Sequence, residues 1–196
     1  MAEAIADHLK QILDQIETLK TRYGLSQAVK LIAVSKTFGA HAVKEAYEAG
    51  QILFGENKVQ EAQEKIGVLS HLPLEWHLIG HLQSNKAKRA AEIFSRIHSV
   101  DSFKLAEKLS QSATAFNKTL PILLQVNTSE ESSKEGFLPD SALLTEEVHR
   151  IAALPGLKLD GLMTIGPLSE QERDIRQAFE RLRHLRDQIE TTLPAL

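Results

Sequence analysis

The sequence contains no cysteine, which excludes disulfide bonds, thiolate nucleophiles and cysteine-based zinc or iron–sulfur sites. Aromatic residues are also scarce, with seven Phe, two Tyr and one Trp. The basic stretch from Lys86 to Arg89 therefore lacks the interleaved aromatic side chains of single-stranded nucleic-acid sites. With a net charge of −3, the chain is not expected to bind mainly nucleic acid or an anionic membrane surface.

Several signature segments are missing as well. No apolar run approaches the roughly 20 residues of a membrane span, and the first residues are acidic, so we expect a cytoplasmic protein. Gly161 and Gly166 have P-loop spacing but lack the Lys-Ser/Thr that should follow, and no Gly-x-Gly-x-x-Gly occurs. His77 and His81 have no carboxylate at ligand spacing in the sequence, so no metal site is expected.

What the sequence does contain is a regular alternation of helical and strand patterns. An apolar stripe from Ile5 to Tyr23 predicts an amphipathic helix that ends at Gly24. Six short apolar segments then predict buried strands, at 31–35, 52–54, 76–79, 97–100, 121–126 and 157–163. Helices are expected between them, at about 41–49, 59–66, 85–94, 102–109 and 140–154, and a last one follows from 169 to 189. Without hairpin signals, this order predicts one parallel sheet covered by helices.

Helix boundaries are expected from local signals. Asp101 is expected to cap the helix that follows it, and Gly67 to end the helix before it. The segment 169–172 reads as a capping box for the last helix.

Two parallel architectures fit this pattern, an open doubly wound sheet and a closed (β/α)8 barrel. Six strands are two short of the barrel, yet a further strand is expected just where the sequence stops at Leu196. Two more units of about 30 residues would bring the chain to the roughly 250 residues of a typical barrel. We therefore expect residues 1–196 to form a single domain that is incomplete at its C-terminal end.

Ligands of both architectures bind at the carboxyl ends of the strands, where this sequence places many polar residues. Lys36 directly follows the first strand. Partial desolvation at the exit of a buried strand disfavours the ammonium, and the free amine could then form a Schiff base. Alternatively, Lys36 is a lysine whose stem lies along the strand end and whose head is in water.

Two further groups of strand-end residues leave alternatives open. Asn57 could offer a neutral amide to a ligand oxygen, with Glu56 ion-paired to Lys36 or Lys58; equally, Glu56 and Asn57 could only cap the next helix. Ser84 and Asn85 begin a helix that contains Lys86, Lys88 and Arg89. That start could attract an anion, or it could be a capped helix with a solvated basic face. Met163, after the sixth strand, is most simply a core residue.

Five segments at these strand ends, in this order, resemble the pyridoxal phosphate homeostasis protein family. They are residues 33–37, 54–57, 76–80, 82–86 and 161–165. The resemblance implies a (β/α)8 TIM-barrel type of fold, similar to the pyridoxal phosphate (PLP) domain of fold-type III enzymes such as alanine racemase, with an extra N-terminal helix. It also implies that Lys36 forms the Schiff base with PLP and that Asn57 faces the phenolic oxygen of the cofactor. Met163, Ser84 and Asn85 match positions around the cofactor ring and the mouth of the site.

By the same resemblance, the protein is expected to be a non-catalytic PLP carrier that affects vitamin B6 and amino-acid/keto-acid balance. Its expected partners are PLP and PLP-dependent apoenzymes or a regulatory protein, and it is expected to be a monomer. The last two strands of the family, which hold the phosphate cup and an arginine opposite the pyridine nitrogen, are missing from this sequence.

Two alternatives stay open. A PLP-dependent racemase or decarboxylase would need an acid or base positioned next to the substrate. The racemases that this chain resembles take that group from a second, β-rich domain, which this sequence does not encode. In the other alternative the chain is a different phosphate-binding barrel or an interaction protein, and Lys36 is structural.

Overall fold

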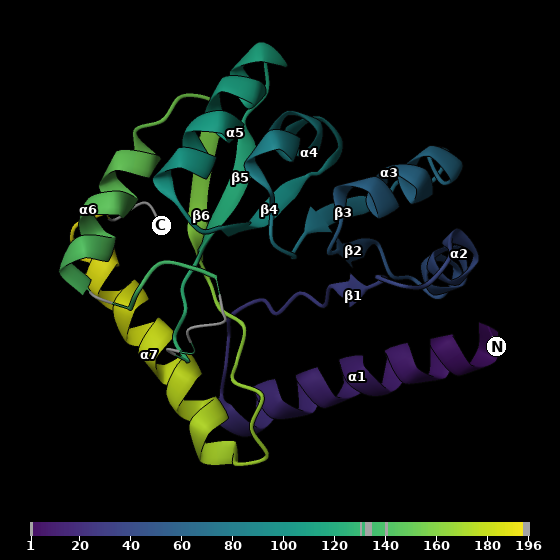
Figure 1. Cartoon of the computed structure of the whole chain (residues 1–196). Helices are drawn as coiled ribbons and strands as arrows, with labels where there is room; N and C mark the ends of the chain where they lie inside the picture. The colour runs from purple at the N-terminus through teal and green to yellow at the C-terminus, as the bar shows by residue number, and fades with distance from the viewer. Residues whose placement is uncertain (1, 130, 132–134, 140, 194–196) are drawn as a thin grey trace. The chain divides into compact units, whose positions relative to one another are not determined.

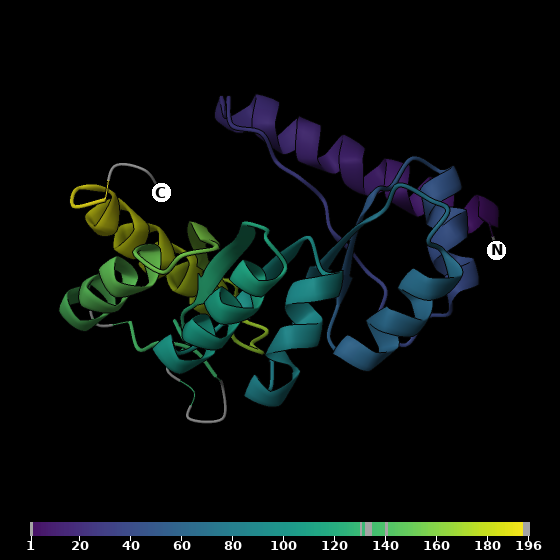
Figure 2. The same cartoon turned by 90° about the horizontal axis from the view of Figure 1, so that it is seen from above.

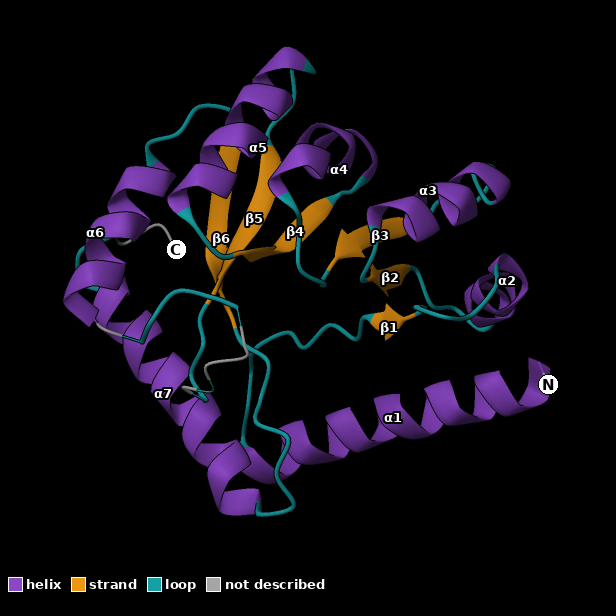
Figure 3. Cartoon of the chain, in the orientation of Figure 1, coloured by secondary structure: helices purple, strands orange, loops and turns teal. Residues whose placement is uncertain are grey.

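Helices and strands alternate along the chain as the sequence predicts (Figure 1, Figure 3). The computed structural model describes residues 2–129, 131, 135–139 and 141–193.

The chain divides into two compact units, Met1–His77 and Leu78–Leu196. The elements are α1 (Ala2–Tyr23), β1 (Ala33–Val34), α2 (Ala40–Glu48), β2 (Leu53–Glu56), α3 (Val59–Val68), β3 (Glu75–Leu78), the 3-10 turn η1 (Ser84–Lys86), α4 (Ala87–Ile93), β4 (Arg96–Val100), α5 (Phe103–Ala115), β5 (Leu120–Gln125), α6 (Ser141–Ala152), β6 (Leu157–Met163) and α7 (Glu172–Glu190).

The first unit contains α1, α2 and α3 and the strands β1-β2-β3 in chain order. β1 and β2 are parallel, with Val34 opposite Gly55. Phe54 and Trp76 pack with their ring centroids 5.6 Å apart, and both side chains are buried. Parallel pairing brings the carboxyl ends of β1 and β2 to the same edge, which sets the residues after them side by side.

The second unit contains the strands β4-β5-β6, also parallel and in chain order. The pairing of β5 with β6 extends to Gln125 and Met163. Helices α4 and α5 pack against each other, and α5 contacts β5 and β6 (Figure 2). The core is formed by aliphatic side chains with almost no exposure, among them Ile97, Leu109, Ile122 and Leu124. Burial on both faces explains why these strands read as continuous apolar runs.

Strand β1 is shorter and more exposed than the sequence predicts. Only Ala33 and Val34 are in strand conformation, in place of the expected 31–35, and Val34 is 46% exposed. β1 lies at the end of the strand order and has β2 as its single neighbour, so it has half the pairing of an inner strand. By contrast, the bounds predicted for β6 are confirmed.

Three helix boundaries differ from the predictions. The N-cap of α5 is Ser102 and not Asp101, because the Ser102 hydroxyl accepts the Leu105 N–H at 3.4 Å. The expected capping box does not form: α7 begins at Glu172, and its N-cap Gln171 makes no side-chain cap hydrogen bond. Gly67 does not end α3, which continues to Val68.

The end of α1 is as predicted, since Gly24 has a φ of +62°, in the left-handed region that favours glycine. No helix in the described part of the chain is both long and apolar enough to cross a membrane.

Candidate functional site

Lys36 lies in the turn that follows β1, and its side chain is exposed. Of the two interpretations of Lys36 that the sequence left open, this exposure agrees with a lysine whose head is in water and not with desolvation at the strand exit. Among the described residues, the Lys36 side chain has no hydrogen-bond or ion-pair partner. The amine is thus free to meet a ligand, and what distinguishes the site is the way its neighbours in the chain are held.

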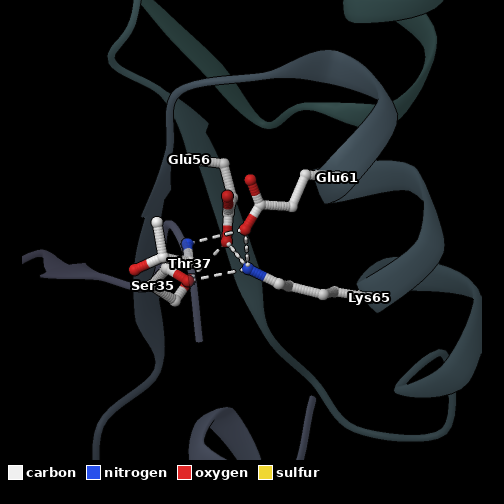
Figure 4. Close-up of polar contacts among 5 residues, drawn as sticks. All are labelled: Ser35, Thr37, Glu56, Glu61 and Lys65. Carbon is white, nitrogen blue, oxygen red and sulfur yellow. Dashed lines mark hydrogen bonds and ion pairs between the residues drawn. The ribbon is translucent and has the colours of Figure 1, made fainter. Parts of the chain in front are cut away.

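The residue before Lys36 is anchored by a buried ion-pair cluster (Figure 4). The Lys65 ammonium, from α3, donates to the Ser35 carbonyl at 2.7 Å and to Glu56 Oε1 at 2.7 Å. The Ser35 hydroxyl donates to the same Glu56 oxygen at 2.6 Å. Ser35 is thereby fixed through both its backbone and its side chain.

The residue after Lys36 is anchored by the same cluster. Glu61 Oε1 accepts the Thr37 N–H at 2.8 Å and the Lys65 ammonium at 2.8 Å. Thr37 has a φ of +69°, an uncommon conformation for a β-branched residue. Such a conformation persists where surrounding contacts fix it. Ser35, Thr37, Glu56, Glu61 and Lys65 are called the Lys65 cluster below.

Burial and hydrogen bonding set the charge state of the Lys65 cluster. The side chains of Glu56 and Lys65 are 0% and 7% exposed. Burial alone lowers the pKa of Lys65, but the hydrogen bonds and charges of Glu56 and Glu61 outweigh it and leave that pKa raised. The hydrogen bonds from Lys65 and Thr37 lower the pKa of Glu61. At neutral pH Glu61 and Lys65 are therefore both ionised.

The partner of Glu56 differs from the expectation. Glu56 pairs with Lys65 and not with Lys36 or Lys58. Nor does it cap α3, whose N-cap residue Lys58 makes no side-chain cap hydrogen bond. The second carboxylate oxygen of Glu56, Oε2, is buried and has no hydrogen-bond partner among the described residues. Glu56 therefore depends on Lys65 for charge compensation.

The structure brings Lys36 and Asn57 to the same edge of the first unit. Each lies two residues beyond the last registered pair of β1 and β2, Val34 and Gly55. Asn57 is half-buried at the end of β2. A free amine and an amide at neighbouring strand ends suit a ligand with an aldehyde beside a phenolic oxygen, so these residues fit the reactive side of PLP.

The other predicted site residues belong to the second unit. Ser84 and Asn85 lie in η1, half-buried and exposed respectively, and the residue before this turn makes no side-chain cap hydrogen bond. Met163 is half-buried at the end of β6, so it is not the fully buried core residue that the sequence also allowed. All three follow or end a strand, as expected for ligand contacts in this class of fold.

A polar cavity of about 240 Å³ adjoins the ends of β5 and β6. Thr128 and Arg181 line it together with Ser129, and Arg181 donates to the Thr128 carbonyl at 2.9 Å. The Thr128 and Thr164 hydroxyls lie 2.8 Å apart. Sequence reasoning missed Arg181, because nothing in the pattern of α7 shows which of its arginines faces the strand ends.

The sequence also failed to show that His81 has carboxylates close by. His81 Nδ1 lies 3.1 Å from Asp101 Oδ2, and Glu135 brings a third ligand atom within 4.8 Å of these two. These three side chains could hold a divalent cation. The side chains of His81 and Glu135 are exposed. The hydrogen bond between His81 and Asp101 is enough to explain why these two side chains lie close together.

The chain resembles proteins of one family over nearly its whole length. Residues 8–196 match the family model "Alanine racemase, N-terminal domain". The pyridoxal phosphate homeostasis protein of Helicobacter pylori is 41% identical over 180 residues, which are 91% of this chain and 80% of the relative. That of Escherichia coli is 44% identical over 179 residues, which are 89% of this chain and 76% of the relative.

Solved structures agree with these matches. PipY of Synechococcus elongatus, solved with PLP bound, has a TM-score of 0.82 at 39% identity and covers 98% of this chain and 84% of its own. Alanine racemase of Clostridium difficile, at 14% identity, has a TM-score of 0.75 over 95% of this chain and 48% of the racemase, and shows the fold alone. The expected fold class, an α/β barrel type resembling the PLP domain of alanine racemase, is confirmed. The chain belongs to the alanine racemase N-terminal domain family and, within it, to the pyridoxal phosphate homeostasis proteins.

Proposed function

We propose that this protein binds PLP as a Schiff base on Lys36 and acts as a PLP carrier that affects vitamin B6 and amino-acid/keto-acid balance. The observation that supports this most is the Lys36 amine, which has no partner among the described residues while both of its chain neighbours are anchored. PipY, 39% identical to this chain, was solved with PLP bound. The names of the curated relatives agree with the same role.

The covalent step needs only the amine and the aldehyde. The Lys36 nitrogen would become joined to the aldehyde carbon by a carbon–nitrogen double bond, and the aldehyde oxygen would be released as water with the two hydrogens of the amine. Once bound, PLP can act as an electron sink for amino-acid chemistry. Asn57 would donate to the phenolic oxygen beside the aldehyde, and Ser84, Asn85 and Met163 would contact the ring and the mouth of the site.

The proposal includes no catalytic turnover. Racemisation or decarboxylation of amino acids needs an acid or base placed against the substrate carbon as well as the cofactor. Residues 1–196 are proposed to form a single PLP-binding domain of a cytoplasmic, monomeric protein. Its further partners would be PLP-dependent apoenzymes or a regulatory protein.

The proposal is tested by adding PLP to the purified protein and recording visible absorption, then reducing with borohydride and measuring the intact mass. Lys36→Ala should abolish the absorption and the reducible adduct. Lys30→Ala is the matched control, because Lys30 precedes β1 as Lys36 follows it and is also exposed. A wild-type protein without adduct, or an equal adduct in Lys36→Ala, would contradict the assignment.

A further inference from the structure

We propose that Glu61, held by Lys65, is a positioning residue for Lys36: it fixes the backbone beside Lys36 so that the amine meets an incoming aldehyde from one direction. This inference rests on the proposed function, since it concerns how the same lysine is presented. It assigns a role to Glu61, which touches neither the Lys36 side chain nor, by this proposal, the ligand.

Both chain neighbours of Lys36 are anchored to one cation, the Lys65 ammonium. Lys65 Nζ holds the Ser35 carbonyl directly and the Thr37 N–H through Glu61 Oε1. The Ser35 N–H also donates to the Gly55 carbonyl at 3.0 Å. Ser35 and Thr37, on either side of Lys36, are both held in this way (Figure 4). The Lys36 side chain itself has no partner among the described residues.

The turn itself is closed by a backbone hydrogen bond, from the Phe38 N–H to the Ser35 carbonyl at 3.1 Å. Lys36 is exposed, so packing does not hold its side chain, and Thr37 has the uncommon φ of +69°. Glu61 accepts a hydrogen bond from the Thr37 N–H and so adds a restraint from α3 to this turn. Without it, the Phe38–Ser35 hydrogen bond still spans the turn, but Thr37 can leave its uncommon conformation and so change the direction of Lys36.

Restraint of this kind affects the rate at which Lys36 captures PLP. Holding a reacting group in one orientation replaces a search among orientations, and a misplacement of about 1 Å can slow a reaction about a hundredfold. Removing one of the two anchors, with Ser35 still held, should have a smaller effect. We expect capture of PLP by Lys36 to slow about tenfold.

The experiment compares three variants at exposed or partly exposed positions of α3. Glu61→Ala removes the acceptor of the Thr37 N–H but leaves the buried Glu56–Lys65 pair. Glu61→Gln keeps an acceptor oxygen at the same place without the charge. Glu64→Ala is the matched control, because Glu64 lies on the same helix, is exposed and loses the same charge.

Two quantities are measured: the rate of the borohydride-reducible adduct on Lys36 with PLP in excess, and hydrogen exchange of the Thr37 amide. Glu61→Ala should slow capture about tenfold and speed the exchange, while Glu61→Gln and Glu64→Ala stay within about twofold of wild type. Capture at the wild-type rate by a Glu61→Ala protein whose Thr37 amide exchanges faster would overturn the inference. A wild-type protein that forms no adduct would overturn the proposed function instead, so the two failures can be told apart.

Discussion

Lys65 Nζ lies 2.7 Å from Glu56 Oε1 at a point where both side chains are almost fully removed from solvent. Further hydrogen bonds offset part of the cost of removing such a pair from water. Here those bonds go to Ser35 and Glu61, and through Glu61 to Thr37, the residues around Lys36. The stability of the first unit and the presentation of the amine therefore depend on the same contacts.

Replacing Lys65 should destabilise the first unit strongly. Lys65→Met fills a similar volume but leaves the buried Glu56 carboxylate without its cation. This should lower the free energy of unfolding by about 3–5 kcal/mol. Urea unfolding followed by fluorescence of Trp76, the single tryptophan, measures this change in the unit concerned. Lys44→Met is the control, because its ion pair with Glu48 is exposed and should contribute about 0.5 kcal/mol or less. Equal urea midpoints for the two variants would argue against a role of the buried pair in stability.

Stability should depend on pH through Glu61. Its pKa is lowered in the folded protein from an ordinary value of 4.5 by the hydrogen bonds from Lys65 and Thr37. A carboxylate with a lowered folded pKa stabilises the fold fully above its unfolded pKa, and this contribution is lost as the pH falls through the folded pKa. Wild type should therefore be more stable than Glu61→Gln above pH 4.5, and the difference should shrink as the pH falls further below that value. A difference that is independent of pH would contradict the assignment.

A glycine near the end of β5 should not tolerate a side chain. Gly136 has a φ of +132°, and a Cβ there would lie 2.9 Å from both the Asn127 nitrogen and the Gln125 oxygen. Gly136→Ala should therefore destabilise the second unit, by more than the roughly 1 kcal/mol of an ordinary conformational mismatch. Gly67→Ala is the opposite case, because Gly67 is helical with open space around it, and should stabilise by up to about 1 kcal/mol. Thermal unfolding of the two variants should shift in opposite directions.

The proposal of a carrier without turnover predicts little exchange of amino-acid α-hydrogen. Incubation of the PLP-loaded protein with L-alanine in heavy water should incorporate deuterium no faster than free PLP does. Proton and mass spectra of the recovered amino acid report this directly. Incorporation at enzyme-like rates, above about 1 per second, would show that the chain supplies an acid or base after all.

Most of the element order could be predicted from the sequence, because apolar periodicity is a local property. β6 has its predicted bounds, and α1 ends at Gly24 as expected. The cap of α5 was misplaced by one residue, because Asp101 and Ser102 are adjacent and both residue types make good N-caps.

The site was only partly predictable, because its contacts join distant parts of the chain. The spacing of Glu61 and Lys65 on one helix is a recognisable ion-pair pattern. That Lys65 also reaches Ser35 and Glu56 follows only once β1, β2 and α3 are packed. The apolar strand before Lys36 allowed both a desolvated and an exposed amine, and the packed structure shows the exposed one.

The most direct test of the central claim is peptide mapping after PLP addition and borohydride reduction, with every lysine peptide quantified. The account predicts one equivalent of the pyridoxyl group per chain, on the peptide that contains Lys36. In the Lys36→Arg variant, no other lysine peptide should carry more pyridoxyl label than it does in the denatured chain. A label spread over the exposed lysines, or unchanged labelling in Lys36→Arg, would contradict it.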